Sequence, residues 1–164
     1  MRRAIFQAFL LITIVLFFEG CGVYSFSPSG KPDFKSVYIN QFETTTIEFQ
    51  LADRLTEQVI DAFIEDNTVE IREKSQAEAD MQGTMTSYKR DPYTYDINDQ
   101  VSEYVVKINI HVRVTKTGTE EVFWEDDFYA EGVYKADTET EEDGQNRAIA
   151  ILTADILDRT TKSW

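Results

Sequence analysis

Few residues in this chain have the types and spacing that catalysis needs. His111 is the only histidine among 164 residues, and the alternation around it places it on the polar side of a predicted strand. A general base needs a partner that orients it and an environment that tunes its pKa, so we interpret His111 as a surface residue. The sequence has no G-x-S-x-G turn, Walker loop, H-E-x-x-H helix or glycine-rich dinucleotide turn. We therefore predict no catalytic residue, no cofactor and no enzymatic activity.

Carboxylates at residues 137–143 form the one cluster dense enough to hold a cation. Their spacing does not match that of an EF-hand calcium loop. Two pairs have instead the spacing of a capping box, in which two residues satisfy each other's backbone N–H at a helix start: Thr138 with Glu141, and Thr140 with Asp143. Because negative charge is also favoured at a helix N-terminus, we favour a helix start over calcium binding and predict no metal site.

Cys21 is the only cysteine, so no intrachain disulfide can form. It follows a positively charged start and an apolar run at residues 4–18. That run is shorter than the roughly 20 residues that a transmembrane helix needs, and its length is typical of a secretory signal peptide. With the small Gly20 before it, Cys21 resembles the acylated cysteine of bacterial lipoproteins, although Phe18 and Glu19 differ from the usual residues of that motif.

The expected processing divides the chain into three parts. Residues 1–20 are predicted to be a lipoprotein signal peptide, residues 21–34 a lipidated tether, and residues 35–164 a single domain. An uncleaved N-terminal anchor is the alternative. Gly22 stands where an inner-membrane retention signal usually has Asp, so the resemblance to bacterial lipoproteins implies the outer membrane, with the domain facing the periplasm.

Charge narrows the classes of partner. The chain carries 30 acidic and 16 basic residues, a net charge of −14. Removal of residues 1–20 would leave 29 acidic and 14 basic residues, a net charge of −15. Such a surface repels nucleic acid and anionic lipid headgroups, so we expect neither as an electrostatic partner. Aromatic residues make up 13% of the chain, which favours a folded domain over disorder.

Hydrophobic periodicity predicts a strand and a helix at the start of the domain. Residues 36–42 alternate as a strand does. Thr45 and Glu48 have the spacing of a capping box. An apolar stripe then recurs at helical steps: Ile47, Leu51, Leu55, Val59, Ala62 and Phe63. We therefore predict a helix that begins near Thr45 and ends near Asn67.

Further strands follow. Short strands are predicted at residues 69–71 and 81–88, and residues 89–99 are predicted to form a loop because they are rich in turn formers. The clearest strand is residues 103–115, where apolar and polar residues alternate as in a sheet with one buried face. Residues 122–134 return as its partner across a turn at Gly118, so a long hairpin is expected.

A closing helix completes the expected fold. Its buried stripe is Ala148, Ile149, Leu152, Ile156 and Leu157. The predicted class is α+β, with two helices packed on one face of a mixed, largely antiparallel sheet of four or five strands.

Four tyrosines lie in or beside the predicted loop: Tyr88, Tyr93, Tyr95 and Tyr104. Tyrosine is enriched at the centres of protein interfaces, so these four are candidate partner-binding residues. An aromatic lid over the sheet explains them equally well.

The order and spacing of several stretches resemble the LptE family of lipopolysaccharide-assembly lipoproteins. The resemblance depends on their succession rather than on a single signature: Cys21–Tyr24, Val37–Phe42, Met81–Tyr88, Pro92–Tyr95, Val101–Tyr104 and Val122–Glu125. It implies a lipoprotein that plugs a large outer-membrane β-barrel and supports its assembly, in a one-to-one complex with this lipopolysaccharide translocon. It also implies contact with lipopolysaccharide through basic residues, for which the nearest candidates are Lys89, Arg90, Lys107 and Arg113, with Lys89 and Arg90 taken first.

A second resemblance leaves another function open. The stretch Val37–Phe63 is also similar to the opening of periplasmic lipoproteins that activate cell-wall synthases or build secretion pores. That resemblance implies a membrane-anchored regulator of a cell-wall enzyme, or a component of a secretion pore.

Overall fold

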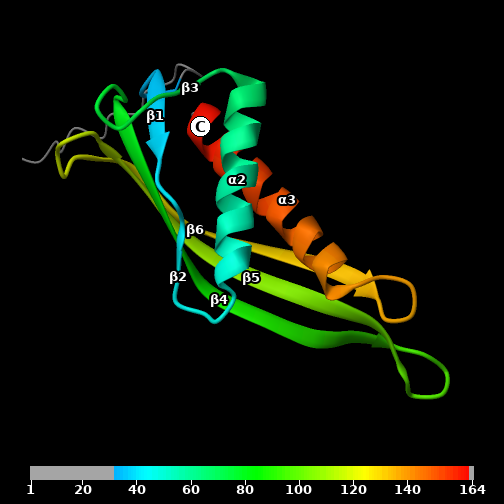
Figure 1. Ribbon diagram of the computed structural model, residues 1–164. Helices are drawn as coiled ribbons and strands as arrows, with labels where there is room; N and C mark the ends of the chain where they lie inside the picture. Colours follow the sequence, from blue (N-terminus) through cyan, green and yellow to red (C-terminus); the bar gives the residue numbers. More distant parts are fainter. Residues whose placement is uncertain (1–31, 163–164) are drawn as a thin grey trace, which may run out of the picture.

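A computed structural model of the chain describes residues 32–162. Its elements in chain order are β1 (Ser36–Ile39), β2 (Glu43–Thr44), α2 (Phe49–Asp66), β3 (Glu70–Ile71), β4 (Ala79–Tyr95), β5 (Val101–Lys116), β6 (Val122–Lys135) and α3 (Glu141–Thr161). Figure 1 shows the long strands crossing beneath the two helices. Cys21 and the predicted signal peptide lie outside the described residues.

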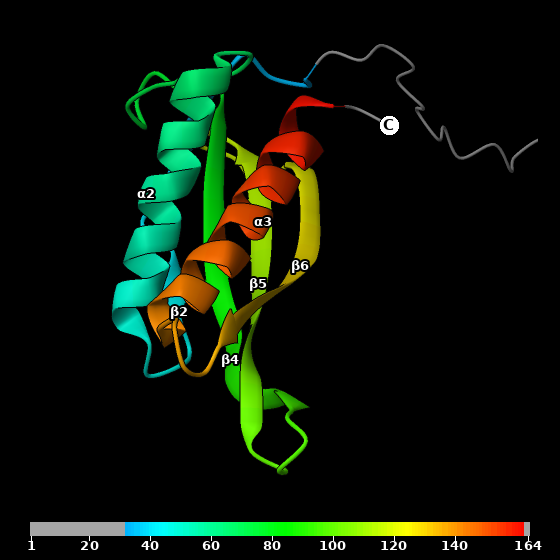
Figure 2. The ribbon, with the colours of Figure 1, turned by 90° about the vertical axis from the view of Figure 1, so that its right-hand side faces the viewer.

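The strands form one mixed sheet of six, in the order β3-β1-β4-β5-β6, with β2 also paired to β4. Strands β1 and β2 run parallel to β4, whereas β4, β5 and β6 are antiparallel neighbours. Both helices lie on the same face of the sheet (Figure 2). The predicted α+β class is confirmed, although the sheet has more strands than expected because β2 forms just after the first predicted strand.

The core lies between that face and the helices. It takes alternate residues of the central strands, among them Met81, Met85, Ile108, Ile110 and Val112, and the buried stripes of α2 and α3, among them Leu51, Leu55, Val59, Leu152 and Ile156. Ile110 and Val112 share the buried face, which confirms the predicted register of the central strand. Phe34, the last residue of the predicted tether, also belongs to this core.

The predicted start of the first helix is wrong. Helix α2 begins at Phe49, and its N-cap Glu48 makes no side-chain capping hydrogen bond. The Thr45 N–H donates to Met85 O at 3.0 Å, which continues the pairing of β2 with β4 and holds the chain extended. Ile47, expected in the buried stripe, is therefore outside the helix and 87% exposed.

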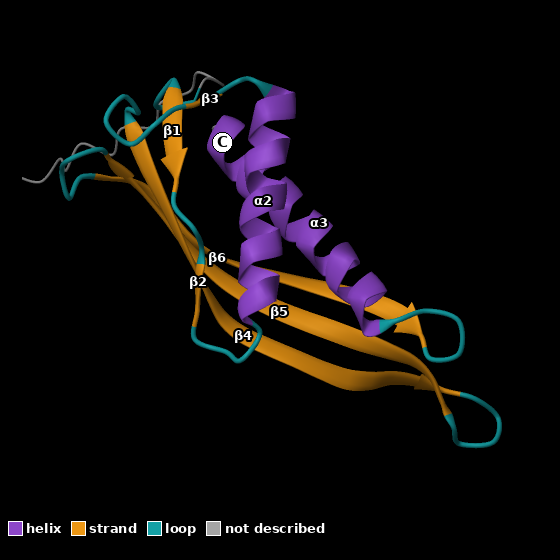
Figure 3. Ribbon diagram, viewed as in Figure 1, coloured by secondary structure: helices purple, strands orange, loops and turns teal. Residues whose placement is uncertain are grey.

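The predicted loop at residues 89–99 is also wrong. Strand β4 continues to Tyr95, and only residues 96–100 connect it to β5 (Figure 3). Pro92 is tolerated because β1 and β2 pair only with residues 79–85, so β4 is an edge strand at that point. Register shifts between Pro92 and Tyr95 mark a local irregularity. Asp91 and Pro92 of this stretch therefore lie in a strand edge, whereas Asp96, Asn98 and Asp99 lie in the connecting loop as predicted.

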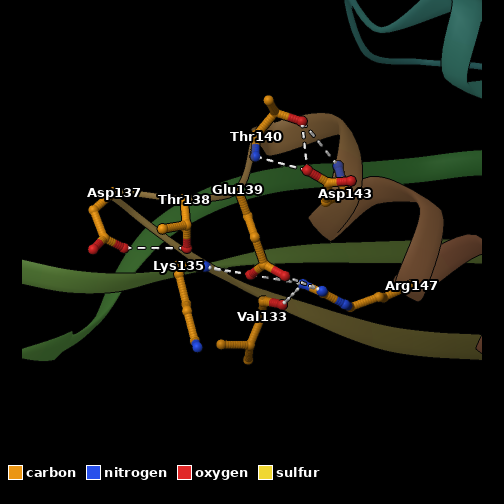
Figure 4. Close-up of polar contacts among 8 residues, drawn as sticks. All are labelled: Val133, Lys135, Asp137, Thr138, Glu139, Thr140, Asp143 and Arg147. Atoms are coloured by element: carbon orange, nitrogen blue, oxygen red, sulfur yellow. Dashed lines mark hydrogen bonds and ion pairs between the residues drawn. The ribbon is translucent and has the colours of Figure 1, made fainter.

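Helix α3 starts as one of the two predicted capping boxes requires. The Thr140 side chain accepts from the Asp143 N–H, and the Asp143 carboxylate accepts from the Thr140 N–H at 2.8 Å (Figure 4). The alternative pair with Thr138 does not form the box, since Thr138 bonds to Asp137 instead.

The helix sits close on β6, because a Cβ on Gly132 would lie 1.8 Å from the Gly144 carbonyl oxygen. Within the part of the chain that the structure describes, neither helix is both long and apolar enough to cross a membrane.

Candidate interaction surface

The face of the sheet opposite the helices is lined by charged pairs that join neighbouring strands. The Lys107 Nζ lies 3.1 Å from the Asp91 carboxylate, and the Arg113 Nε lies 3.6 Å from that of Glu125. These pairs are partly exposed, so each contributes little to stability. They make this open face hydrophilic.

His111 lies on the open face, as the alternation of apolar and polar residues around it predicts. Its Nδ1 lies 2.8 Å from an Asp127 oxygen and its Nε2 lies 2.9 Å from a Glu125 oxygen. The hydrogen bond with Asp127, followed by that with Glu125, raises the pKa of His111 above its usual range. The imidazole is therefore a cross-strand link between acidic residues, and both of its nitrogens are already engaged.

The four predicted tyrosines fall into two separate places. Tyr88 and Tyr104 are partly buried and pack against the core. The Tyr88 hydroxyl donates to Glu141 at the start of α3 and accepts from Gln145 Nε2 at 3.0 Å. Burial raises the pKa of Tyr88. These two tyrosines match the alternative of an aromatic cover over the sheet.

Arg90 belongs to the same aromatic cluster. Its guanidinium lies 3.8 Å from the centroid of the Tyr104 ring, which stacks on Tyr134 with 5.6 Å between centroids. Its Nε donates to the Tyr134 hydroxyl and lies 3.4 Å from a Glu141 oxygen. The hydrogen bond to Tyr134 raises the pKa of Arg90. This role of Tyr134 was missed from the sequence, because it depends on the cross-strand pairing of Tyr104 with Tyr134.

Lys89, the other predicted lipopolysaccharide contact, faces away from Arg90. Successive residues of a strand point to opposite faces, and Lys89 pairs in register with Lys107 of the open face. It is exposed, and residues 32–162 offer it no ion pair within 4.0 Å. The two adjacent basic residues therefore do not form one site.

Tyr93 and Tyr95 lie at the far end of the β4–β5 hairpin and are 53% and 61% exposed. Ile97, at the tip, is fully exposed, and no pattern in the sequence singled it out. Asp96 stabilises the turn, because its carboxylate accepts hydrogen bonds from the N–H groups of Asn98 at 2.8 Å and Gln100 at 2.9 Å. These bonds, led by that of Gln100, lower the pKa of Asp96. The hairpin therefore presents apolar and aromatic side chains on a firm turn.

Acidic residues are dispersed rather than gathered into a metal centre. Within residues 32–162, no group of three or more His, Cys, Asp or Glu side chains is arranged to hold a metal ion. A hollow of about 430 Å³ on the open face is lined by both signs of charge, including Lys74 and Asp80, which lie 2.9 Å apart. Exposed apolar side chains occur at the hairpin tip and also at the start of α2, where Ile47 and Phe49 are 87% and 67% exposed.

Comparison with solved structures shows the same fold in several bacterial proteins. A DUF330-family protein from Xanthomonas campestris matches with a TM-score of 0.63 at 10% identity, over 82% of this chain and 87% of the other. The uncharacterized lipoprotein B from Nitrosomonas europaea matches with a TM-score of 0.53 at 11% identity, over 86% and 91%. A minor lipoprotein from Acinetobacter baumannii matches with a TM-score of 0.51 at 13% identity, over 78% and 91%.

Sequence comparison assigns the family. No significant match to a curated protein sequence was found. The family model LptE, described as lipopolysaccharide-assembly, matches residues 34–160, which include every helix and strand of the structure except the last residue of α3. The chain therefore belongs to the LptE family of lipopolysaccharide-assembly proteins.

Proposed function

We propose that this chain is an outer-membrane lipoprotein that plugs the lipopolysaccharide-exporting β-barrel and supports its assembly. The observation that carries the proposal is the LptE family match, which spans residues 34–160. Acyl chains on Cys21 would hold the protein at the periplasmic side of the membrane, since two or three chains bind far more stably than one. The partner is the barrel itself, in a one-to-one complex.

The shape of the domain supports this role. Glu78, just before β4, lies at the same end of the sheet as Lys35, which follows the predicted tether. Its carboxylate accepts from the Lys35 N–H at 2.9 Å, and its carbonyl accepts from the Thr117 N–H at 3.0 Å. From that end β4 extends over 17 residues, which is about 55 Å at 3.3 Å per residue. The hairpin tip therefore lies far from the predicted tether and can reach deep into a lumen.

The surface supports it as well. A plug in a hydrated lumen needs polar sides, and the open face is lined by charged pairs. The net charge of −14 suits a lumen with basic residues, which would also attract lipopolysaccharide phosphates. We place the main partner contact at Tyr93 and Tyr95. Of the two basic candidates for lipopolysaccharide contact, Lys89 is the more available, since Arg90 already binds Tyr134 and Glu141.

Purification of the tagged full-length protein from detergent-solubilised outer membrane tests the proposal. We expect an outer-membrane barrel in equal amount, and acyl chains on Cys21 by mass spectrometry. A Cys21→Ser variant should lack both the modification and firm membrane attachment. Depletion of the protein should leave the barrel protease-sensitive and lipopolysaccharide missing from the cell surface. Recovery of a cell-wall synthase or a secretion-pore protein instead, with normal surface lipopolysaccharide, would overturn the proposal in favour of the alternative function.

A further inference from the structure

The two long edge strands of the sheet, β4 and β6, differ in how far their outward backbone groups are hydrogen-bonded. An edge strand with unpaired backbone groups is a template for a further strand. At the β6 edge, several outward backbone N–H and C=O groups already make hydrogen bonds with side chains. Val133 O accepts from Arg147, the Lys135 N–H donates to Glu139 at 2.7 Å, and the Asp127 N–H donates to Asp126 at 3.1 Å. Figure 4 shows the first two of these contacts.

The outward backbone groups of β4 can be identified from its pairing. Met85 O accepts from the Thr45 N–H, so Met85 faces away from β5. The register shift between Met85 and Ser87 restarts the alternation, which turns the groups of Tyr88, Arg90 and Pro92 outward. The pairing of β6 with β5 leads to the same assignment of outward residues in β4. Val133 faces outward from β6, so its partner Val105 faces β4 and Asp91 is the inward residue.

This part of the β4 edge is open. Among the described residues, no hydrogen bond reaches the backbone N–H or C=O of Tyr88 or Arg90, or the C=O of Pro92. Pro92 has no N–H to satisfy, which fits its outward position. Strand β2 ends its pairing at Met85, and within residues 32–162 no other element pairs with this side of β4 beyond that point (Figure 1). The fold thus closes the β6 edge at Asp127 and again at Val133 and Lys135, and it leaves residues 88–92 of the β4 edge available.

We infer that the β4 edge at residues 88–92 receives an extended segment of the partner polypeptide as an added strand, with a carboxylate beside Lys89. Backbone hydrogen bonds would hold such a segment, and side chains at alternate positions would select it. Lys89 is exposed and has no ion pair among the described residues, and the exposed Tyr93 lies just beyond the segment. The inference rests on the proposed function and names where the barrel protein binds.

A second copy of this chain fits the same edge poorly. A two-fold antiparallel pairing centred on Lys89 or on Arg90 would place that residue opposite its own copy, and like charges directly opposite destabilise a strand pair. A partner segment with an acidic residue replaces this repulsion with an ion pair. Acidic segments are repelled by most of this surface, because the chain carries a net charge of −14, so Lys89 would also select the register.

Substitution of Arg90 separates the backbone contribution from the side chain. Arg90→Pro and Arg90→Ala both remove the guanidinium, but only Arg90→Pro removes the outward N–H at the centre of the segment, whereas the native Pro92 stands at its end. In co-purification of the full-length protein from outer membrane, we expect Arg90→Pro to recover at least ten-fold less barrel than Arg90→Ala. Equal recovery with the two variants would overturn the inference while leaving the proposed function intact. Absence of any barrel with the unaltered protein would instead overturn the proposed function.

Two further measurements keep the test decisive even where Arg90→Pro fails to fold. Hydrogen exchange on the unaltered protein should show fast amides at Tyr88 and Arg90 that become protected at least ten-fold in the complex; unchanged exchange would contradict strand addition. A photoreactive residue in place of Lys89 should crosslink to an extended acidic segment of the barrel, and Lys89→Glu should be rescued by changing that carboxylate to Lys. A crosslink to a second copy of this chain would overturn the assigned occupant.

Discussion

Glu139 joins three parts of the chain through one carboxylate. It accepts from the Lys135 N–H at the end of β6 and binds Arg147 of α3, whose guanidinium also donates to Val133 O (Figure 4). The hydrogen bond from Arg147, followed by that from Lys135, lowers the pKa of Glu139 to about 2 from 4.5. This carboxylate therefore helps to fix the strand edge against the helix only while it is ionised.

The pKa of Glu139 predicts a dependence of stability on pH. Because the folded-state pKa lies below the unfolded one, the stabilisation is present above pH 4.5 and is lost as the pH falls towards about 2. Urea unfolding at pH 7 and pH 3 should show a smaller loss of free energy for Glu139→Gln than for the unaltered protein. Equal losses in the two proteins would contradict this role. Glu142→Gln, with its carboxylate 3.9 Å from Arg54, is the control for removal of one acidic charge.

Ile110 tests the register of the central strand. It is 1% exposed, and its neighbour His111 lies on the open face. We expect Ile110→Asp to reduce the free energy of unfolding by about 3 kcal/mol or more, because it buries an unpaired carboxylate. His111→Thr should reduce it by no more than about 1 kcal/mol, since it removes exposed polar contacts. Thermal melts compare the two variants, and a larger loss with His111→Thr would mean that the faces are reversed.

At the scale of elements, a helix or strand was predictable where burial of one face or a contact between nearby residues determines it. The alternation at residues 103–115 follows from burial of one face, and the capping box of α3 is a local contact between Thr140 and Asp143. The start of α2 was not predictable, because Thr45 bonds to Met85, which lies 40 residues further along the chain. The outer half of β4 was missed for a similar reason. Its turn-forming residues become a strand by pairing with β5.

The cap of α3 supplies a prediction at this scale. Thr140→Ala should destabilise the protein by about 1 kcal/mol, the usual effect of losing an N-cap side chain. Thr138→Ala should change stability by no more than about 0.5 kcal/mol, because Thr138 bonds only to the exposed Asp137. Denaturant unfolding of both variants checks the difference. A greater loss with Thr138→Ala would favour the other capping box and contradict the observed helix start.

At the scale of the whole molecule, the sequence indicated the partner surface only in part. Tyr93 and Tyr95 are exposed at the hairpin, whereas Tyr88 and Tyr104 pack against the core. Composition alone cannot separate these pairs, because the separation depends on which strand face each residue occupies and on the helix above it. Arg90 was grouped with Lys89 for the same reason. Its binding to Tyr134 requires three strands to lie side by side.

The length of the hairpin gives a prediction for the complete protein. Thr94 pairs with Glu103 across β4 and β5, so residues 95–102 can be replaced by Asn-Gly, a two-residue loop that suits antiparallel strands. This change removes Tyr95 and Ile97 but leaves the stacked Tyr104 and the core in place. If the protein contacts its barrel through the tip, the shortened variant should keep its melting temperature within a few degrees and lose most of the co-purifying barrel.

The control changes Gly118, in the β5–β6 turn at the opposite end of the sheet, to Asn. Asn also tolerates the positive φ of 76° at this position, and this variant should retain the complex. Full recovery of the barrel with the shortened hairpin would show that the tip makes no essential contact and would restrict the interface to the open face and the β4 edge.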